Sequence, residues 1–188
     1  RDWSSDVCSS DLVLANNHTF DYGQEALQDT LKALQSSDLL SAGAGESRAG
    51  AVRPLIVERK ELRIGVMAYT DVLNPGPPPP DDGATIAVFR ESSFDQEVRE
   101  ARKACDTLIV FFHWGEEYMR RPTERQQHIA HLCVNAGADL VLGCHPHVLQ
   151  TEETFRGKPI VYSMGGFVFD SKRLGSDRSA IFEFELFS

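Results

Sequence analysis

The sequence lacks the features that mark several common classes of protein. Four cysteines are present, but Cys105, Cys133 and Cys144 have no paired spacing, so neither a disulfide framework nor a zinc knuckle is indicated. No stretch approaches the roughly 18 consecutive apolar residues of a membrane-spanning helix. Lysine and arginine number 19 against 28 acidic residues, and they form no basic cluster. This acidic balance argues against binding of nucleic acid.

A nucleotide-binding loop is also missing. The glycines of Ser41-Ala-Gly-Ala-Gly45 lack the third glycine and the following helix of a dinucleotide fingerprint. With 41% hydrophobic residues, the composition is that of a globular protein with one sizeable core. The functional class therefore has to come from local motifs.

The first twelve residues differ in character from the rest. They have neither helical nor strand periodicity, and residues 2–12 match the translation of a common DNA-sequencing adaptor. We therefore expect residues 1–12 to be an adaptor artefact, and residues 13–188 to be a partial domain that lacks its natural N-terminal segment. A natural tail rich in serine and aspartate is the alternative. On the adaptor interpretation, the sequence says nothing about a signal peptide or a membrane anchor.

The remaining chain alternates between helical and strand patterns, which predicts a mixed α/β protein. Helices are expected from Asp21, as the capping residue, to Ser36 or Ser37, from about 93 to 104, and from about Pro122 to Gly137. Strands are expected at 54–58 and 62–69 as a hairpin, and at 106–113, 138–144, 158–162, 167–169 and 181–187.

A proline-rich segment interrupts this alternation. Residues 74–83 begin with Asn74 and continue through a run of prolines, which excludes a helix or a central strand because proline has no amide donor. The segment is either a passive linker, which is the more common case, or a lid beside the functional site.

Polar side chains with metal-binding chemistry follow three of the apolar strand patterns. Asn17 and His18 end the first pattern, His113 ends the second, and His145 and His147 end the third. A single histidine is usually a structural residue, but chance seldom repeats the same junction three times. Because ligands of open α/β sheets gather beyond the carboxyl ends of the strands, we expect one shared metal site.

Cys144 directly precedes His145 and has two interpretations. It is either a soft metal ligand or, as we favour, a small buried residue.

Four motifs, in this order, carry a resemblance to a known family. They are Leu14-Ala-Asn-Asn-His18 with Asp21 and Gly23, His113-Trp-Gly-Glu-Glu-Tyr118, Gly137-Ala-Asp-Leu-Val-Leu-Gly-Cys-His-Pro-His-Val-Leu-Gln150, and Ile160-Val-Tyr-Ser-Met-Gly-Gly-Phe167. From about Val13 to its end, the chain resembles the CapA family of bacterial poly-γ-glutamate capsule synthesis proteins, a branch of the calcineurin-like metallophosphatases. Each motif alone is weak, whereas their combination is specific.

The resemblance implies an α/β (α+β) fold, a metallophosphatase-like β-sandwich flanked by helices, here incomplete at the N-terminus. It also implies a centre of two divalent ions, Mn, Fe or Zn, at the strand ends. The implied metal ligands are Asn17, His113, His145 and His147. His18 resembles the family's histidine that is not a ligand and that acts in catalysis. Three carboxylates are candidates for orienting imidazoles, with a solvated carboxylate as the alternative: Asp21, Glu116 and Glu117.

Two departures from the family pattern bear on the site. The family's first strand and the loop after it, which carry acidic metal ligands, would precede Val13. Gly166 stands where many relatives have asparagine. None of the four implied ligands is negatively charged, so we expect this chain to bind divalent metal weakly.

The resemblance implies a protein of capsule or poly-γ-glutamate biosynthesis that hydrolyses a phosphoester or an amide. The expected partners are an anionic polymer or a phosphorylated or amide substrate and a membrane-bound synthesis complex, with no nucleic acid. The full-length parent is expected in the cell envelope, outside the cytoplasm. The alternative is an accessory subunit without catalytic activity that binds polymer or partner proteins.

Overall fold

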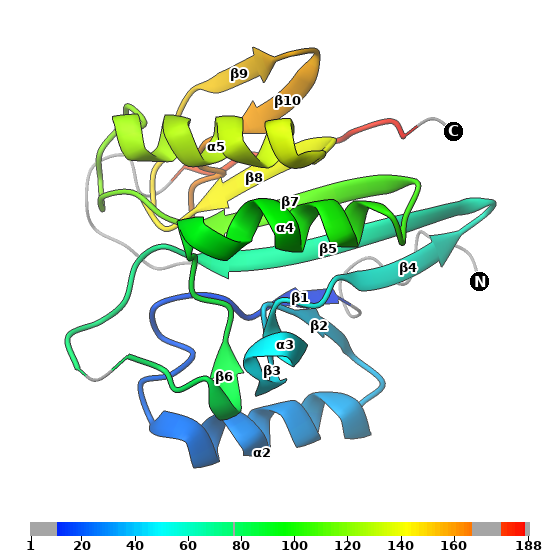
Figure 1. The fold of residues 1–188 in the computed structure, drawn as a ribbon. Coiled ribbons are helices and arrows are strands. Elements are labelled where there is room, and N and C mark those ends of the chain that lie inside the picture. The colour runs from blue at the N-terminus through cyan, green and yellow to red at the C-terminus, as the bar shows by residue number, and fades with distance from the viewer. Residues whose placement is uncertain (1–10, 77, 167–177, 187–188) are drawn as a thin grey trace.

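The computed structural model describes residues 11–76, 78–166 and 178–186. Its centre is a sheet of six strands (Figure 1), which lie in the order β4 (Leu55–Arg59), β5 (Leu62–Thr70), β7 (Thr107–His113), β8 (Leu140–Cys144), β10 (Lys158–Val161) and β9 (Glu152–Phe155). The four inner strands are parallel, and the two edge strands are antiparallel to their neighbours. The carboxyl ends of β5, β7 and β8 therefore meet at one edge of the sheet.

Helices α4 (Glu91–Arg102) and α5 (Glu124–Ala136) cover one face of this sheet (Figure 1). Their apolar side chains join those of the strands in the largest hydrophobic cluster, in which the rings of Phe112 and Trp114 stack at a centroid distance of 4.8 Å. Thr123 begins α5 with a capping box, and Gly137 ends it in the left-handed region at φ 119°. These signals fix the length of the helix that leads into β8.

A smaller layer lies beside β4 and β5 (Figure 1). It contains β1 (Asp11–Val13), β2 (Leu40–Ala42), β3 (Ala44–Ser47), β6 (Asp82–Ile86), α2 (Gly23–Ser36) and α3 (Arg48–Ala51). β1 is parallel to β2, and β3 is antiparallel to β6. Leu27 of α2 is fully buried in a cluster with Ala44, Ala84 and Ile86. This packing anchors the segment after β1, which carries Asn17 and His18.

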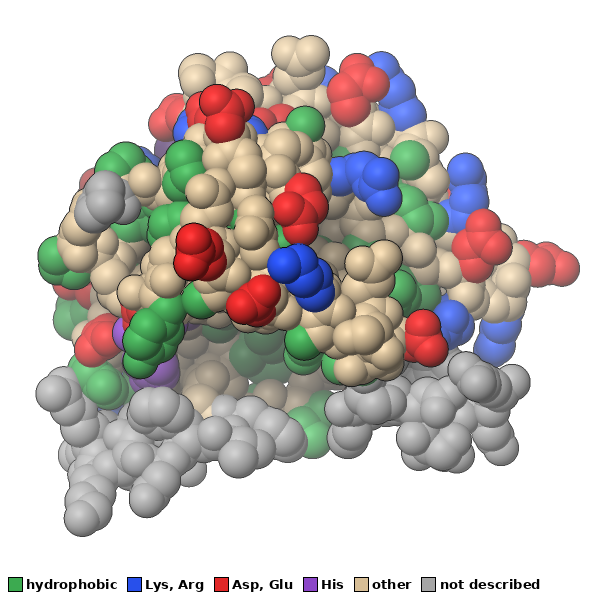
Figure 2. All heavy atoms as spheres, turned by 90° about the horizontal axis from the view of Figure 1, so that it is seen from below, with side chains coloured by type: hydrophobic (Ala, Val, Ile, Leu, Met, Phe, Trp, Pro, Cys, Tyr) green, Lys and Arg blue, Asp and Glu red, His purple; other side chains and the backbone are tan. Residues whose placement is uncertain are grey.

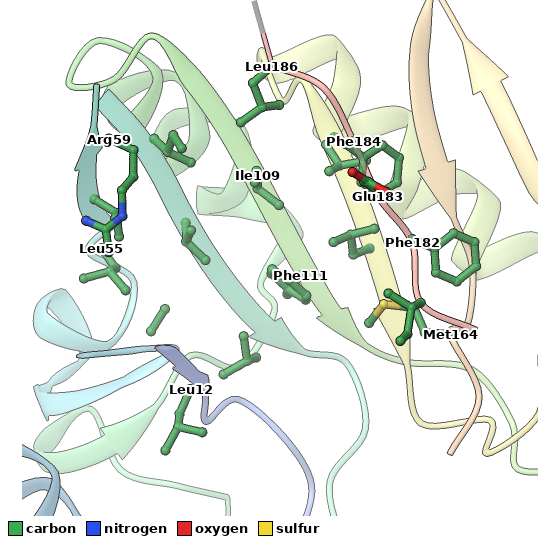
Figure 3. Close-up of a pocket in the computed structure, with 18 residues that line it drawn as sticks. Leu12, Leu55, Arg59, Ile109, Phe111, Met164, Phe182, Glu183, Phe184 and Leu186 are labelled. Atoms are coloured by element: carbon green, nitrogen blue, oxygen red, sulfur yellow. The ribbon is translucent and has the colours of Figure 1, made fainter. Parts of the chain in front are cut away.

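The sheet face opposite α4 and α5 is lined by an apolar groove of about 620 Å³ (Figure 3). Side chains of the central strands alternate between this groove and the helical face, and Ile109 and Phe111 point into it. The β1–β2 pair covers one side, and Phe182 and Phe184 pack on the other. His113 continues the alternation of Ile109 and Phe111, so it leaves the sheet on the groove side.

The mixed α/β fold with helices flanking the sheet confirms the predicted fold class. The hairpin of β4 and β5 and the helices α2, α4 and α5 are confirmed, with ends shifted by a few residues. The prediction that Asp21 caps α2 was wrong, because Tyr22 occupies the capping position and its side chain makes no capping hydrogen bond. The carboxylate of Asp21 binds His18 and Asn74 instead.

Two other predicted strands have different outcomes. The prediction of a strand at 181–187 was wrong for residues 181–186, where Phe182 and Phe184 contact the sheet without strand pairing. The strand at 167–169 lies outside the described residues. Among the helices that the structure describes, none has the length and apolar character needed to cross a membrane.

Candidate metal centre

Strand register brings three of the predicted ligands to one place. Thr70, His113 and Cys144 lie side by side at the ends of β5, β7 and β8. His145 follows β8 directly, and its ring centroid lies 4.6 Å from that of His113 and 6.0 Å from that of His147. The convergence expected from the strand patterns is therefore present for all three imidazoles.

Asn17 reaches the same place from the loop after β1. Its side-chain Oδ1 lies 2.8 Å from Nε2 of His113. An amide oxygen and an imidazole nitrogen are both donor atoms for borderline divalent ions. The structure thus gathers the four residues Asn17, His113, His145 and His147, while their role as ligands stays a prediction.

The backbone holds the histidine pair in an unusual conformation. His145 has φ 97° and His147 has φ 58°, in the left-handed region that favours glycine. Such conformations persist where the surrounding structure enforces them, and they cluster at functional sites. Tyr118 also has a positive φ, of 65°, and its backbone N–H donates to the carbonyl of Pro146 over 2.7 Å. The loop after β7 is thereby fastened to the turn between the two histidines.

The electrostatic setting keeps two of these imidazoles neutral. Burial, together with the neighbouring His145 and His147, lowers the pKa of His113 to about 3. Burial also lowers the pKa of His145, although the carboxylate of Glu117 acts in the opposite direction. A histidine must be deprotonated to bind a metal ion. Both rings are therefore in the metal-binding form at neutral pH.

The two acidic residues of the loop after β7 differ in position. The donor atoms of Glu117, His145 and His147 all lie within 4.8 Å of one another. Glu116, the adjacent acidic residue, is not part of this group. The structure thus distinguishes Glu117, which lies beside His145 and His147, from Glu116, whereas the sequence left both as candidates.

His18 lies at the margin of the cluster. Its side chain is 69% exposed, and its Nδ1 is 2.7 Å from a carboxylate oxygen of Asp21. Asp21 thus orients the ring of His18, the candidate catalytic residue. The carboxylate itself has a lowered pKa, chiefly because of its hydrogen bond with His18. Figure 2 shows histidine side chains grouped on one side of the molecule, with acidic side chains beside them.

Asn74 belongs to the site, although no sequence motif indicated it. Its Oδ1 accepts a hydrogen bond from Nδ2 of Asn17 at 2.8 Å, and its Nδ2 donates to Asp21 at 2.7 Å. Nδ2 also lies 3.2 Å from Nδ1 of His18. The start of the proline-rich segment therefore lies beside the site, as the less common interpretation of that segment expected. Its position directly before the prolines was the only available signal.

Cys144 lies behind His113. Its Sγ is 3.4 Å from Nδ1 of His113, and burial raises the pKa of the thiol to about 12. A protonated thiol is a poor metal ligand, because the thiolate is the binding form. This favours the interpretation of Cys144 as a small residue, here only partly buried, that contacts the His113 ring.

Comparisons with known proteins give the same family as the resemblance of the motifs. Residues 6–171 match the family described as bacterial capsule synthesis protein PGA_cap. The PGA biosynthesis protein CapA of Bacillus subtilis is 34% identical over 176 residues, which cover 93% of this chain and 46% of that protein. The capsule biosynthesis protein CapA of Bacillus anthracis is 33% identical over 179 residues, with 93% and 44% covered.

A more distant relative has a different description. The probable polyglutamine synthesis accessory protein Rv0574c of Mycobacterium tuberculosis is 29% identical over 178 residues, which cover 89% of this chain and 47% of that protein. The chain therefore spans about half the length of these curated relatives.

The fold is also found among solved structures. The sulfate thiohydrolase SoxB of Thermus thermophilus, in complex with glycerol, superposes with a TM-score of 0.56 at 17% identity, over 87% of this chain and 29% of that chain. This likeness concerns the fold, which is metallophosphatase-like. Since the family match extends over most of the sequence, the chain belongs to the CapA, or PGA_cap, family of bacterial capsule synthesis proteins.

Proposed function

We propose that the full-length protein is a metal-dependent hydrolase that cleaves a phosphoester or an amide bond during synthesis of an anionic capsule polymer such as poly-γ-glutamate. One observation carries this proposal. Asn17, His113 and His145 come from three separate parts of the chain and meet at the carboxyl ends of the parallel strands, together with His147.

The residues present fit a divalent metal centre. The set combines one amide oxygen with three imidazoles, which suits Mn, Fe or Zn. His113 and His145 are held neutral by burial, and the backbone of His145 and His147 is held in a conformation that costs about 1 to 3 kcal/mol at each residue. In the full-length protein we propose two such ions. When bound, they polarise a substrate oxygen and activate water for attack.

The chain's own residues supply positioning and proton transfer. The ring of His18 is exposed to solvent beside the cluster, where a substrate can reach it. Nδ1 of this ring donates to Asp21, and Asn74 in turn donates to the carboxylate of Asp21. A positioned imidazole can donate a proton to a leaving group in the transition state, which typically contributes about 10²- to 10⁴-fold in rate.

A second candidate function is that of an accessory subunit without catalytic activity. It is favoured by the description of the Mycobacterium tuberculosis relative as a probable synthesis accessory protein. On either proposal the full-length protein acts in the cell envelope, with a membrane-bound synthesis complex as its partner and no role for nucleic acid.

The two functions are separated by an experiment on a purified full-length homologue. Metal content is measured by mass spectrometry, and turnover is measured on phosphoester substrates and on poly-γ-glutamate. The hydrolase proposal expects bound metal and turnover. Both should fall at least tenfold in the variant of the homologue that is equivalent to His147→Ala. His128→Ala is the matched control, because His128 is an exposed histidine paired with Glu91 on the helical face. Polymer binding without metal or turnover would favour the accessory subunit.

A further inference from the structure

Gln150 ends the long motif that begins at Gly137, and the candidate metal centre makes no use of it. The residue is buried, with 7% of its surface exposed. Its Nε2 donates to the carbonyls of Met119 at 2.8 Å and Arg121 at 3.3 Å, and its Oε1 accepts from the buried Gln126 at 2.9 Å. A buried amide whose polar atoms all have partners fixes the segments it joins, because breaking a bond would leave a polar group unsatisfied. Gln150 therefore holds the end of the loop after β7.

The same loop is fastened at two further points. Gly115, with φ 85°, packs so closely on the side chain of Gln126 that a β-carbon there would lie 2.6 Å from it. The backbone N–H of Tyr118 donates to the carbonyl of Pro146 at 2.7 Å. Because Pro146 lies between the two histidines of the candidate metal centre, the loop is held next to that centre. Residues 119–121 continue from this point and end at the bonds with Gln150.

Two cations stand side by side on this fixed loop, since Arg120 and Arg121 are both exposed. Within the described part of the chain, neither guanidinium makes an ion pair or a hydrogen bond. Other arginines of the same part do pair with a carboxylate, namely Arg48, Arg63, Arg90, Arg99, Arg102 and Arg125. The whole chain has a formal net charge of −9, so the pair is a local positive charge in an acidic protein.

The acidic residues of the same loop leave this charge in place. The carboxylate of Glu117 lies within 4.8 Å of a nitrogen of His145 and of His147. Among the residues that the structure describes, neither Glu116 nor Glu117 forms an ion pair with an arginine. Both guanidinium groups are therefore open to an anion from outside the chain.

Guanidinium groups suit a carboxylate ligand. An arginine can donate two parallel N–H bonds to one carboxylate, a pairing that is geometrically more specific than the point charge of a lysine. A chain of γ-linked glutamate carries a free carboxylate on every residue. The acidic excess of this protein repels such a polymer, so a site that binds it has to be locally cationic.

We propose that Arg120 and Arg121 bind carboxylates of a polyanionic chain such as poly-γ-glutamate and direct it to the adjacent candidate site. Gln150 is a positioning residue in this account, because it holds the backbone that carries the pair. The choice of polymer rests on the proposed function, whereas the binding itself requires neither metal nor hydrolysis.

The test is binding of fluorescein-labelled poly-γ-glutamate to the 188-residue chain in EDTA, measured by fluorescence anisotropy. The double variant Arg120→Gln with Arg121→Gln should bind at least about tenfold more weakly, because charge-assisted contacts are lost. The matched control is Arg59→Gln with Lys60→Gln, which removes the same charge from two adjacent exposed residues. This pair lies in the β4–β5 turn, at the opposite end of β5 from the site. The control should change the affinity by less than about twofold, since distant exposed charges are screened.

A neutral polymer identifies the group that is bound. Poly-γ-glutamine of equal length should bind the parent chain no better than it binds the Arg120 and Arg121 double variant. Thermal unfolding checks that every variant is folded. Equal losses in the two double variants, equal binding of the charged and the neutral polymer, or no binding by the parent chain would overturn the proposal.

The outcome is separable from catalysis. Polymer binding that depends on the arginine pair, together with a full-length homologue that hydrolyses nothing, would keep this surface and reject the hydrolase. Turnover of poly-γ-glutamate by a homologue, unchanged in the equivalent double variant, would keep the hydrolase and reject this surface.

Discussion

His147 combines a strained backbone with a side chain that lies in the candidate metal centre. Its φ of 58° lies in the left-handed region, where a residue other than glycine costs about 1 to 2 kcal/mol. Its imidazole is one of the donors beside His145 and Glu117. If His147 is a metal ligand, as we propose, this conformation lowers the stability of the fold and in return places that ligand.

This exchange predicts the effect of His147→Gly. Glycine adopts the left-handed conformation without a steric cost, so the metal-free variant should unfold at a temperature equal to or above that of the parent. Added Mn²⁺ should stabilise the parent and not the variant. His128→Gly, inside helix α5, should instead lose about 1 kcal/mol. Thermal unfolding of the parent chain and of both variants measures these effects. A large loss of stability in metal-free His147→Gly would refute the prediction.

Asn74 connects the groups on both sides of the site. It accepts a hydrogen bond from Asn17 and donates one to Asp21. Hydrogen bonds of this kind contribute about 1 to 3 kcal/mol. In a full-length homologue with measurable turnover, the variant equivalent to Asn74→Ala should lower kcat about tenfold. Asn135→Ala, at an exposed position of α5, is the control; equal kcat values for both variants would exclude a positioning role for Asn74.

The end of strand β8, which directly precedes His145, packs very closely against its surroundings. Gly143 packs so tightly that a β-carbon there would collide with the carbonyl oxygen of Tyr162 and the indole nitrogen of Trp114. Those two groups are joined by a hydrogen bond of 2.9 Å. The end of β8 is therefore fixed by packing as well as by strand pairing.

Gly143→Ala should consequently destabilise the fold by about 1 to 3 kcal/mol, the usual cost of an overpacked core. It should also weaken metal binding, because it displaces the strand end that carries His145. Gly50→Ala is the control, since a β-carbon there meets only ordinary contacts in the short helix α3. Chemical denaturation compares the two, and an equally stable Gly143→Ala variant would contradict the packing argument.

The elements that the sequence predicts well are those with local signals. Helix α5 was predictable because Pro122 and Gly137 mark its limits, and the hairpin of β4 and β5 because charged residues separate two apolar runs. The cap of α2 was not predictable, because Asp21 is drawn to His18 and Asn74 by contacts between distant segments. The extended segment at 181–186 has an apolar alternation but no strand pairing, which sequence alone does not reveal.

The candidate site was also predictable only in part, namely for the residues that follow strands. Asn17, His113 and the two histidines follow strands, and parallel strands bring their carboxyl ends together. Glu117 and Asn74 stand in loops, whose course depends on long-range contacts such as the hydrogen bond from Tyr118 to Pro146. Their positions therefore required the three-dimensional structure.

At the scale of the whole molecule, the polar cluster and the apolar groove lie on the same side of the central sheet. Phe111 lines the groove, and His113, two residues further along β7, belongs to the cluster. The helices α4 and α5 cover the other face. The site thus stands at the carboxyl edge of the paired strands β7 and β8, which position His113 and, directly after β8, His145.

The adaptor interpretation of residues 1–12 stays a prediction about the whole chain. If these residues do not belong to the natural protein, nothing has selected them for packing. Deleting residues 1–10 should leave the unfolding temperature within about 1 °C of the parent value, below the shift of roughly 2 to 4 °C that 1 kcal/mol produces in a domain of this size. Scanning calorimetry of both chains measures this, and a clear drop would favour a natural tail.

The metal centre is tested most directly by anomalous diffraction from crystals of a Mn²⁺-loaded full-length homologue. We expect an anomalous peak within about 2.0 to 2.4 Å of an imidazole nitrogen in the turn equivalent to His145-Pro146-His147. A second peak is expected near Asn17 and His113. Peaks only at other positions, or none at full Mn²⁺ saturation, would contradict the assignment of this cluster as a metal centre.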